Sequence, residues 1–213
     1  VIEREEEISA SLVIAVACYV PLHSVLGAQG LLQREWPSDV ASVLKQQIQE
    51  PLDELALRAS IPSLTSTENT VSLKVQRLYE ENPYPRWISP NVVTKKRTIG
   101  DILRGSPLRF DLGSYNSPKA PEILVAGCGT GQHVIDVAAR YEGAQVLALD
   151  LSISSLSYGL RKSIELDFDN ITFAQGDIMH LGDIKQSFDL IESVGVLHHL
   201  ETPLSGWKIL KDL

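Results

Sequence analysis

Residues 123–133 read ILVAGCGTGQH, in which four apolar residues lead directly into glycines at positions 127, 129 and 131. Glycine adopts backbone dihedrals that other residues resist, and it lets a ligand approach the main chain closely. The N–H groups of a helix that begins just after such a turn are free to bind an anion. Packing alone also favours glycines between a strand and a helix, so the triplet by itself is a weak signal. The stretch predicts a strand, a tight turn with room for a ligand, and a helix.

The residue after the last of these glycines separates two kinds of cofactor turn. A dinucleotide fingerprint requires glycine as its sixth residue, and this chain has Gln132 at that position. The sequence therefore disfavours a nicotinamide-dependent oxidoreductase, which stays as a third alternative.

Strand and helix patterns alternate from residue 122 onward. Short apolar runs predict strands at 123–126, 145–149, 171–174 and 188–193, and helical periodicity predicts helices at 134–141, 152–166 and from residue 203. Such alternation is typical of parallel strands joined by right-handed crossovers. The predicted fold class is α/β, a partial Rossmann-like parallel sheet of strand order 3-2-1-4 with an N-terminal helical region.

Two acidic residues follow predicted strands. Asp150 ends the second strand, 19 residues after Gly131, where a carboxylate can accept hydrogen bonds from both hydroxyls of a ribose. Asp177 and Ile178 follow the third strand, where the acid could accept an adenine amino group and Ile178 could pack on the ring. The competing interpretation makes both acids helix or turn caps. Since the carboxyl ends of parallel strands meet at one edge, we expect Asp150, Asp177 and Ser193 in the wall of one pocket.

Two histidines leave the fourth strand in the run VLHHL. His198 and His199 are sequential and cannot both point the same way, which makes a metal pair improbable, and no metal site is expected. Either histidine could serve as a general base, whereas a packing or capping role is the competing interpretation. They are the only catalytic candidates that the sequence offers.

The rest of the chain divides into three parts. Residues 1–90 read as a helical region, residues 91–120 as a connecting segment, and residues 121–213 as the partial sheet domain. The net charge is −8, from 19 Lys and Arg against 27 Asp and Glu, so neither nucleic acid nor an anionic membrane is an expected partner. Two cysteines, Cys18 and Cys128, give no disulfide framework and indicate a reducing, cytoplasmic setting.

Four ordered motifs between Ile123 and Leu200 resemble class I S-adenosylmethionine-dependent methyltransferases. These are the glycine turn, the acid after strand 2, the Gly176-Asp177 pair after strand 3 and the VLHHL run after strand 4. The segment YEENPYPRW at residues 79–87 is similar to one that precedes the methyltransferase domain in bacterial proteins that often carry N-terminal tetratricopeptide repeats. The stretch YVPLHS at residues 19–24 fits that group as well.

The resemblance implies S-adenosylmethionine as the cofactor and a methyl acceptor that is a small molecule or a protein. It implies that the glycine turn passes the amino-acid end of the cofactor, that Asp150 holds the ribose, and that Asp177 with Ile178 holds the adenine. Three roles are open for Tyr79, Tyr84, Arg86 and Trp87: they fold over the cofactor, they form the acceptor side, or they make a rigid, proline-containing turn docked on the domain. The complete set of expected cofactor residues is Gly127, Cys128, Gly129, Gly131, Asp150, Leu151, Asp177, Ile178, Ser193, Tyr79 and Arg86.

The resemblance also implies seven strands, of which this chain supplies four, so the chain looks truncated after strand 4. A mostly apolar parallel strand such as the fourth one normally has a neighbouring strand on both sides. We expect its open edge to be covered by a second copy of the chain, which would make a homo-oligomer, or by residues outside this sequence. The alternative is cover from the helix at residue 203 or from the N-terminal helices. Activity of this portion alone is an open question, and a non-catalytic, methyltransferase-like binding module is the alternative function.

Overall fold

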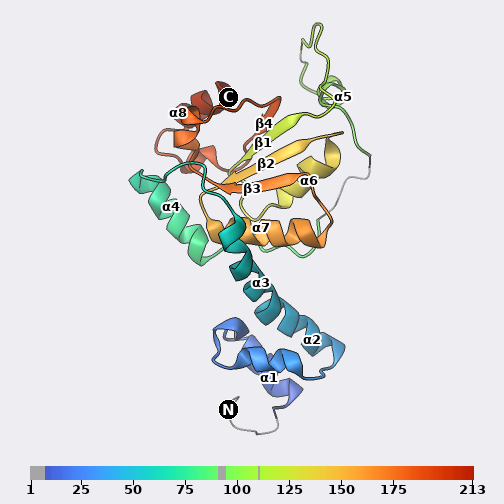
Figure 1. The fold of residues 1–213 in the computed structure, drawn as a ribbon, viewed down its shortest axis with the longest axis vertical. Helices are drawn as coiled ribbons and strands as arrows, with labels where there is room; N and C mark the ends of the chain where they lie inside the picture. Colours follow the sequence, from blue (N-terminus) through green and yellow to red (C-terminus); the bar gives the residue numbers. More distant parts are fainter. Residues whose placement is uncertain (1–7, 91–94, 110) are drawn as a thin grey trace. The chain divides into compact units, whose positions relative to one another are not determined.

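The computed structural model describes residues 8–90, 95–109 and 111–213 (Figure 1). The chain forms two compact units, which divide between Leu57 and Arg58. The sequence placed residues 58–90 with the helical region, whereas in the structure they lie in the unit that holds the sheet. Among the described residues, no helix is both long enough and apolar enough to cross a membrane.

The first unit is a small helical cluster with its own core. Its elements are α1 (Ala10–Ala17), η1 (Leu22–Ser24), η2 (Ala28–Gln33), α2 (Ser38–Leu44), the π-helical turn η3 (Lys45–Gln49) and α3 (Glu50–Leu57). Leu31, Leu44 and Ile48 are fully buried in this core, and burying each such side chain contributes about 1.5–3 kcal/mol. α2 begins at Ser38, directly after Pro37, which is its N-cap residue, and Asp39 is the acidic residue of its first turn.

A proline explains the change of helical pitch between α2 and α3. Pro51 has no N–H to donate, and its ring crowds the carbonyl group four residues earlier in a regular α-helix. The preceding turn widens into η3, where the N–H of Glu50 donates to the carbonyl of Lys45, five residues back. The helical path thus continues through the proline.

The second unit is built on a parallel sheet of order β3-β2-β1-β4, which confirms the predicted fold class. Its strands are β1 (Glu122–Ala126), β2 (Gln145–Asp150), β3 (Ile171–Gln175) and β4 (Leu190–Glu192). Every pair is parallel, and the register places Val125 beside Ala148 of β2 and beside Glu192 of β4. β4 is shorter than predicted, since its regular pairing with β1 covers three residues.

Helices cover both faces of this sheet, as the two-fold alternation of strand side chains requires. Ile123, Val125, Val146 and Ala148 face α6 (Gln132–Arg140) and α7 (Ile153–Glu165). Leu124, Ala126, Leu147 and Leu149 face the opposite way, in one cluster with residues of η5 (Ile178–Asp183) and with Leu210 of α8 (Pro203–Lys211). The remaining elements are η4 (Arg58–Ser60), α4 (Thr70–Glu81), α5 (Ile99–Arg104) and η6 (Leu197–His199).

The two edges of the sheet differ. Beyond β3, the N–H of Leu64 donates to the carbonyl of Gln175, and the N–H of Gln175 donates to the carbonyl of Pro62, both at 2.8 Å. This short ladder brings the chain before α4 to the edge of β3, in parallel. On the other side, β4 pairs with β1 and with no further strand in the described part of the chain. That a second copy of the chain covers the free edge of β4 remains a prediction.

Candidate functional site

The glycine turn after β1 has the backbone that its sequence predicts. Gly127, Gly129 and Gly131 all have positive φ, of +76°, +53° and +83°, a region that only glycine enters readily. The N–H groups of Gly127 and Cys128 both donate to the carbonyl of Leu149, at 2.7 and 2.9 Å. These bonds tie the turn to the end of β2, and Gly131 forms the N-cap of α6.

Asp150 links the glycine turn to the start of α7. Its Oδ2 accepts from the N–H of Gly129 at 2.8 Å, and its Oδ1 accepts from the N–H of Ser152 at 3.0 Å. Burial raises the pKa of this carboxyl, and the hydrogen bonds from the backbone oppose that shift. Because a carboxylate has about four lone-pair sites, each oxygen can still accept from a ligand hydroxyl.

Asp177 is almost fully buried, at 1% exposure, and one of its oxygens has no partner. Its Oδ1 accepts from the N–H of Met179 and so caps η5, while its own N–H donates to Oγ1 of Thr65. Its Oδ2 is buried without a hydrogen bond among the residues that the structure describes. An unpaired buried carboxylate oxygen is costly, so it points to a ligand that donates to it.

A cavity of about 360 Å³ lies where the four strands end. That volume suits a small organic ligand, and the position is the usual ligand edge of a parallel sheet. The wall contains most of the residues predicted for the site: Tyr79, Gly127, Cys128, Gly129, Asp150, Leu151, Asp177, Ile178 and His199. The other lining residues are Ser72, Val75, Tyr84, Pro85, Thr130, Gln132, His133, Leu149, Gly176, Val194, Gly195, Val196 and Leu200.

Four predicted residues lie outside this wall: Gly131, Ser193, Arg86 and His198. The expectation that Ser193 lines the pocket is wrong, because its Oγ turns back and donates to the carbonyl of Ala126 at 3.0 Å. The rings of His198 and His199 are 4.0 Å apart, and of the two only His199 reaches the cavity. Among the described residues, no group of three or more His, Cys, Asp or Glu side chains could hold a metal ion.

The segment after α4 both docks on the glycine turn and reaches the cavity. Thr130 Oγ1 donates to the carbonyl of Pro85 at 2.5 Å, and Trp87 Nε1 donates to the carbonyl of Thr130 at 3.0 Å. Arg86 turns away and lies over the ring of Tyr158, 4.5 Å from its centroid. Tyr84 and Pro85 line the cavity. The docked turn is thus present, and contact of this segment with the cofactor or the acceptor stays a prediction.

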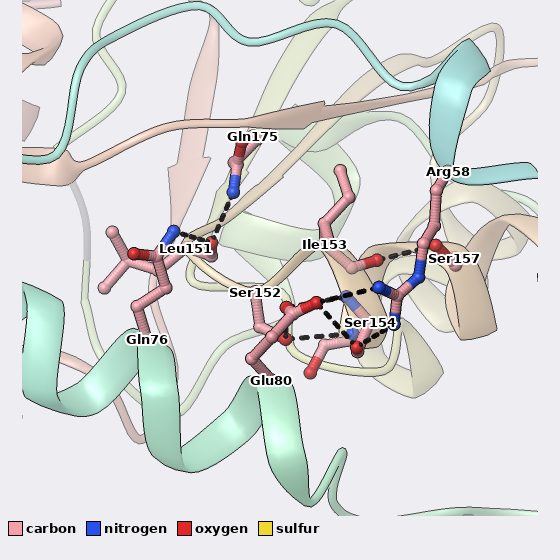
Figure 2. A network of polar contacts seen from close by, with 10 residues as sticks. Arg58, Gln76, Glu80, Leu151, Ser152, Ile153, Ser154, Ser157 and Gln175 are labelled. Atoms are coloured by element: carbon pink, nitrogen blue, oxygen red, sulfur yellow. Dashed lines mark hydrogen bonds and ion pairs between the residues drawn. The ribbon is translucent and has the colours of Figure 1, made fainter. Parts of the chain in front are cut away.

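The helix α4 closes one side of the cavity, and polar bonds hold it against the start of α7 (Figure 2). Glu80 accepts from Ser152 Oγ at 3.1 Å, from Ser154 N at 3.0 Å and from Ser154 Oγ at 2.8 Å. Arg58 pairs with the same carboxylate at 3.3 Å. A carboxylate at the N-terminus of a helix is also favoured by the helix dipole.

A second contact lies one turn earlier on α4. Gln76 donates to the carbonyl of Leu151 at 2.9 Å, and Gln175 donates to the same oxygen at the same distance (Figure 2). Gln76 and Glu80 are four residues apart and share one helix face. Sequence reasoning missed this attachment, although the spacing of the two polar residues is visible in the sequence.

We expect Glu80→Ala to loosen α4. The change leaves the two serines and Arg58 without their shared acceptor, so the free energy of unfolding should fall by about 1–3 kcal/mol, measured by urea denaturation. Amide hydrogen exchange in residues 70–81 should accelerate. Glu81→Ala is the matched control, since Glu81 is exposed and makes no such contact. Equal stability of the two variants would show that Glu80 does not hold the helix.

A partly buried cluster of three polar side chains next to the glycine turn was also missed. His133 Nε2 lies 2.7 Å from Glu192 Oε2, and the hydroxyl of Tyr141 donates to Glu192 Oε1 at 2.9 Å. Burial acts to raise the pKa of Glu192, but the bonds from His133 and Tyr141 outweigh it, so the pKa lies below its usual value. Burial and the charge of Glu192 raise the pKa of Tyr141, which keeps its hydroxyl protonated.

A parallel sheet of this order, with a glycine turn after β1 and carboxylates at the ends of β2 and β3, defines a Rossmann-like domain for a nucleotide cofactor. Residues 123–208 match the sequence model of a family described as "Methyltransferase domain". This match confirms, for the sheet domain, the predicted resemblance to class I S-adenosylmethionine-dependent methyltransferases.

Relatives with known sequences and structures match parts of the chain. An uncharacterized protein of Synechococcus sp. is 29% identical over 70% of this chain and 36% of its own length. The trans-aconitate 2-methyltransferase of Deinococcus radiodurans is 36% identical over 39% of this chain and 30% of its own length. The structure of PKMT2 from Rickettsia typhi in complex with AdoHcy is 24% identical, with a TM-score of 0.37, over 41% of this chain and 17% of that one. The chain thus spans about a third of the two curated relatives.

Proposed function

We propose that this chain binds S-adenosylmethionine in the cavity at the strand ends and is the cofactor-binding part of a methyltransferase. Asp150 accepts from the ribose hydroxyls, with Leu151 beside it. The turn of Gly127, Cys128 and Gly129 passes the amino-acid end of the cofactor. The location of these residues in one cavity supports the assignment.

The unpartnered oxygen of Asp177 is the observation that carries this proposal. The adenine of the cofactor combines a hydrogen-bond donor, its amino group, with a flat ring whose faces are apolar. Asp177 Oδ2 offers an acceptor without a partner, and Ile178, buried next to it in the cavity wall, offers an apolar surface for the ring. A ligand with a ring amino group therefore satisfies both residues at once.

Methyl transfer requires little of the protein beyond aligning the acceptor with the methyl group. When bound, S-adenosylmethionine would supply an activated methyl group on its positively charged sulfur, and the neutral thioether would be the leaving group. The cavity supplies orientation and exclusion of water, for which α4 and the Tyr84-Pro85 segment form the cover. The acceptor is a small molecule or a protein, and His199, next to Tyr79 in the wall, stays a catalytic candidate.

Three accompanying proposals follow the sequence. The setting is cytoplasmic and reducing, which is supported by the free thiols Cys18 and Cys128. The negative net charge disfavours nucleic acid and anionic membranes as partners. The edge of β4 that has no partner among the described residues favours self-association, which light scattering over a range of concentrations would detect.

Calorimetry with S-adenosylmethionine, S-adenosylhomocysteine and NADH tests the function. We expect both sulfur ligands to bind and NADH not to bind. A chain that binds neither sulfur ligand would overturn the proposal. Binding without methyl transfer to an acceptor panel, by a protein extended to the length of its relatives, would favour the alternative of a non-catalytic binding module.

We expect Asp177→Asn to change which base the cavity prefers. The asparagine can still cap η5, but its amide nitrogen would meet the adenine amino group, donor against donor. Affinity for S-adenosylhomocysteine should fall about 10- to 100-fold, whereas S-inosylhomocysteine, which has a 6-oxo acceptor, should bind better than to the parent chain. Asp183→Asn, at an exposed position of the same element, is the control. Unchanged preference in Asp177→Asn would remove Asp177 from the adenine site.

A further inference from the structure

The residue directly after Asp150 is fixed through its backbone by two different elements. The carbonyl oxygen of Leu151 accepts from Gln175 at the end of β3 and from Gln76 of α4, both at 2.9 Å (Figure 2). The first bond comes from the sheet itself, because Gln175 stands opposite Asp150 in the register of β2 and β3. The second comes from a helix that precedes the sheet in the chain. The peptide that follows Asp150 is therefore held partly by an element outside the sheet.

Ser152, the next residue, ties the same helix to the carboxylate of Asp150. Its N–H donates to Asp150 Oδ1 at 3.0 Å, and its hydroxyl donates to Glu80 of α4 at 3.1 Å. The same hydroxyl accepts from the N–H of Ser155 at 3.1 Å and so caps α7. Ser152 is fully buried, so water cannot replace Glu80 as the acceptor without a rearrangement. The orientation of this residue thus depends on α4 as well as on α7.

The apolar contacts of α4 hold it only weakly. Ser72 is the one buried residue of this helix, whereas Leu73 and Leu78 are 41% and 59% exposed. Little apolar surface of the helix is thus removed from water. The bonds made by Gln76 and Glu80 therefore supply much of the attachment of α4 to the sheet domain.

We propose that Gln76 and Glu80 are positioning residues for the ribose of the cofactor. Neither side chain lines the cavity. They hold the two residues that follow Asp150, and in this way they align its carboxylate with the ribose hydroxyls. The inference rests on the proposed function, and it gives α4 a part in cofactor affinity beyond its place in the cavity wall.

Thermodynamic linkage makes this coupling reciprocal. If the attachment of α4 raises the affinity for a ligand that bonds to Asp150, binding of that ligand strengthens the attachment by the same factor. Ser72, Val75 and Tyr79 line the cavity, so a ligand can also stabilise α4 by touching it directly. A ligand without ribose hydroxyls keeps the direct contacts but lacks the bonds to Asp150. The difference between the two kinds of ligand therefore isolates the proposed coupling.

Calorimetry on the whole chain compares S-adenosylhomocysteine with its 2′,3′-dideoxy form. Gln76→Met keeps the length and the helix propensity of the side chain but removes the donor to Leu151. This variant should bind S-adenosylhomocysteine about 3- to 10-fold more weakly, because only Gln175 still holds the carbonyl, and its affinity for the dideoxy form should change less than about twofold. Arg77→Met, at an exposed position of the same helix, is the matched control and should change neither affinity.

Amide hydrogen exchange in residues 70–81 measures the coupling in the other direction. In the parent chain, saturation with S-adenosylhomocysteine should slow this exchange about 3- to 10-fold more than saturation with the dideoxy form. In Gln76→Met, the difference between the two ligands should shrink to less than about twofold. Glu80→Gln leaves one acceptor oxygen for donors that now share two, and it should show the same selective loss in both measurements.

Each outcome decides one point. Selective loss for the ligand with ribose hydroxyls, in affinity and in protection of α4, supports the inference. If Gln76→Met weakens both ligands equally, α4 is only a wall of the cavity and the inference fails. If it weakens neither ligand, the attachment of α4 does not align Asp150, and the inference fails as well. If the parent chain does not bind S-adenosylhomocysteine, the proposed function itself fails.

Discussion

Gly127→Val is expected to abolish cofactor binding and to lower the free energy of unfolding by about 2–6 kcal/mol. At a φ of +76°, a side chain strains the backbone by about 1–3 kcal/mol. A Cβ at this position would lie 2.4 Å from Cγ2 of Val196, which itself lines the cavity, so overpacking adds about 1–3 kcal/mol. Relief of the clash requires either Val196 or the turn to move, and the turn is held on β2 by its bonds to the carbonyl of Leu149.

Denaturant unfolding and calorimetry with S-adenosylhomocysteine measure the two effects. Gly182→Ala is the control, because a Cβ there meets no atom within 4 Å and the φ of Gly182 is not positive. Gly129→Ala tests the backbone term alone, since its φ is positive but its nearest neighbour, the carbonyl oxygen of Tyr84, is 3.9 Å away. If Gly127→Val were as stable as the control and bound the ligand, the turn would not be the constrained element that its geometry indicates.

The fold of the sheet domain could be predicted because its information is local. Apolar runs, glycines and a serine cap each act within a few residues, and Ser152, the first residue of the range predicted as a helix, caps α7. The acids Asp150 and Asp177 could be placed together because the ends of parallel strands share one edge. No contact between distant residues had to be known for either inference.

The contacts that the sequence did not reveal join segments far apart in the chain. Glu80 meets Ser154 across 74 residues, and His133 meets Glu192 across 59. Glu80 carries no local signal of its contact, because a glutamate on a helix usually faces solvent. The register of β1 against β4, which sets Glu192 beside Val125, brings Glu192 close to the turn after β1 and to the start of α6. Glu192 and the start of α6 become neighbours only once β1 and β4 have paired in the sheet.

The direction in which a side chain points also could not be predicted from the sequence. Arg86 and Ser193 sit in the segments that the motifs selected, yet one stacks on Tyr158 and the other bonds to the carbonyl of Ala126. A motif places a residue near a site, whereas the packing around it decides which way it points. Predictions by motif therefore hold better for backbone groups, such as those of Gly127 and Gly129, than for side chains.

Asp150→Ala is expected to lower affinity for S-adenosylhomocysteine by about 100-fold or more. The ligand's two ribose hydroxyls lose a charged acceptor, and each such bond is worth about 1.5–3 kcal/mol. The N–H groups of Gly129 and Ser152 lose their acceptor too, so the turn becomes less ordered before the ligand arrives. Burial raises the pKa of Asp150, so keeping it ionised in the free protein opposes folding, and the ribose hydroxyls offset that cost on binding.

A ligand without the hydroxyls separates the ribose contact from the order of the turn. The 2′,3′-dideoxy form of S-adenosylhomocysteine should bind the parent chain weakly. It should lose little further affinity in Asp150→Ala, because removing the hydroxyls and removing the carboxylate break the same hydrogen bonds. The coupling from this double-mutant cycle reports the direct contact alone. Asp169→Ala, at an exposed acid just before β3, is the control. If the two losses were additive, Asp150 would act only through the glycine turn, and the ribose would have another acceptor.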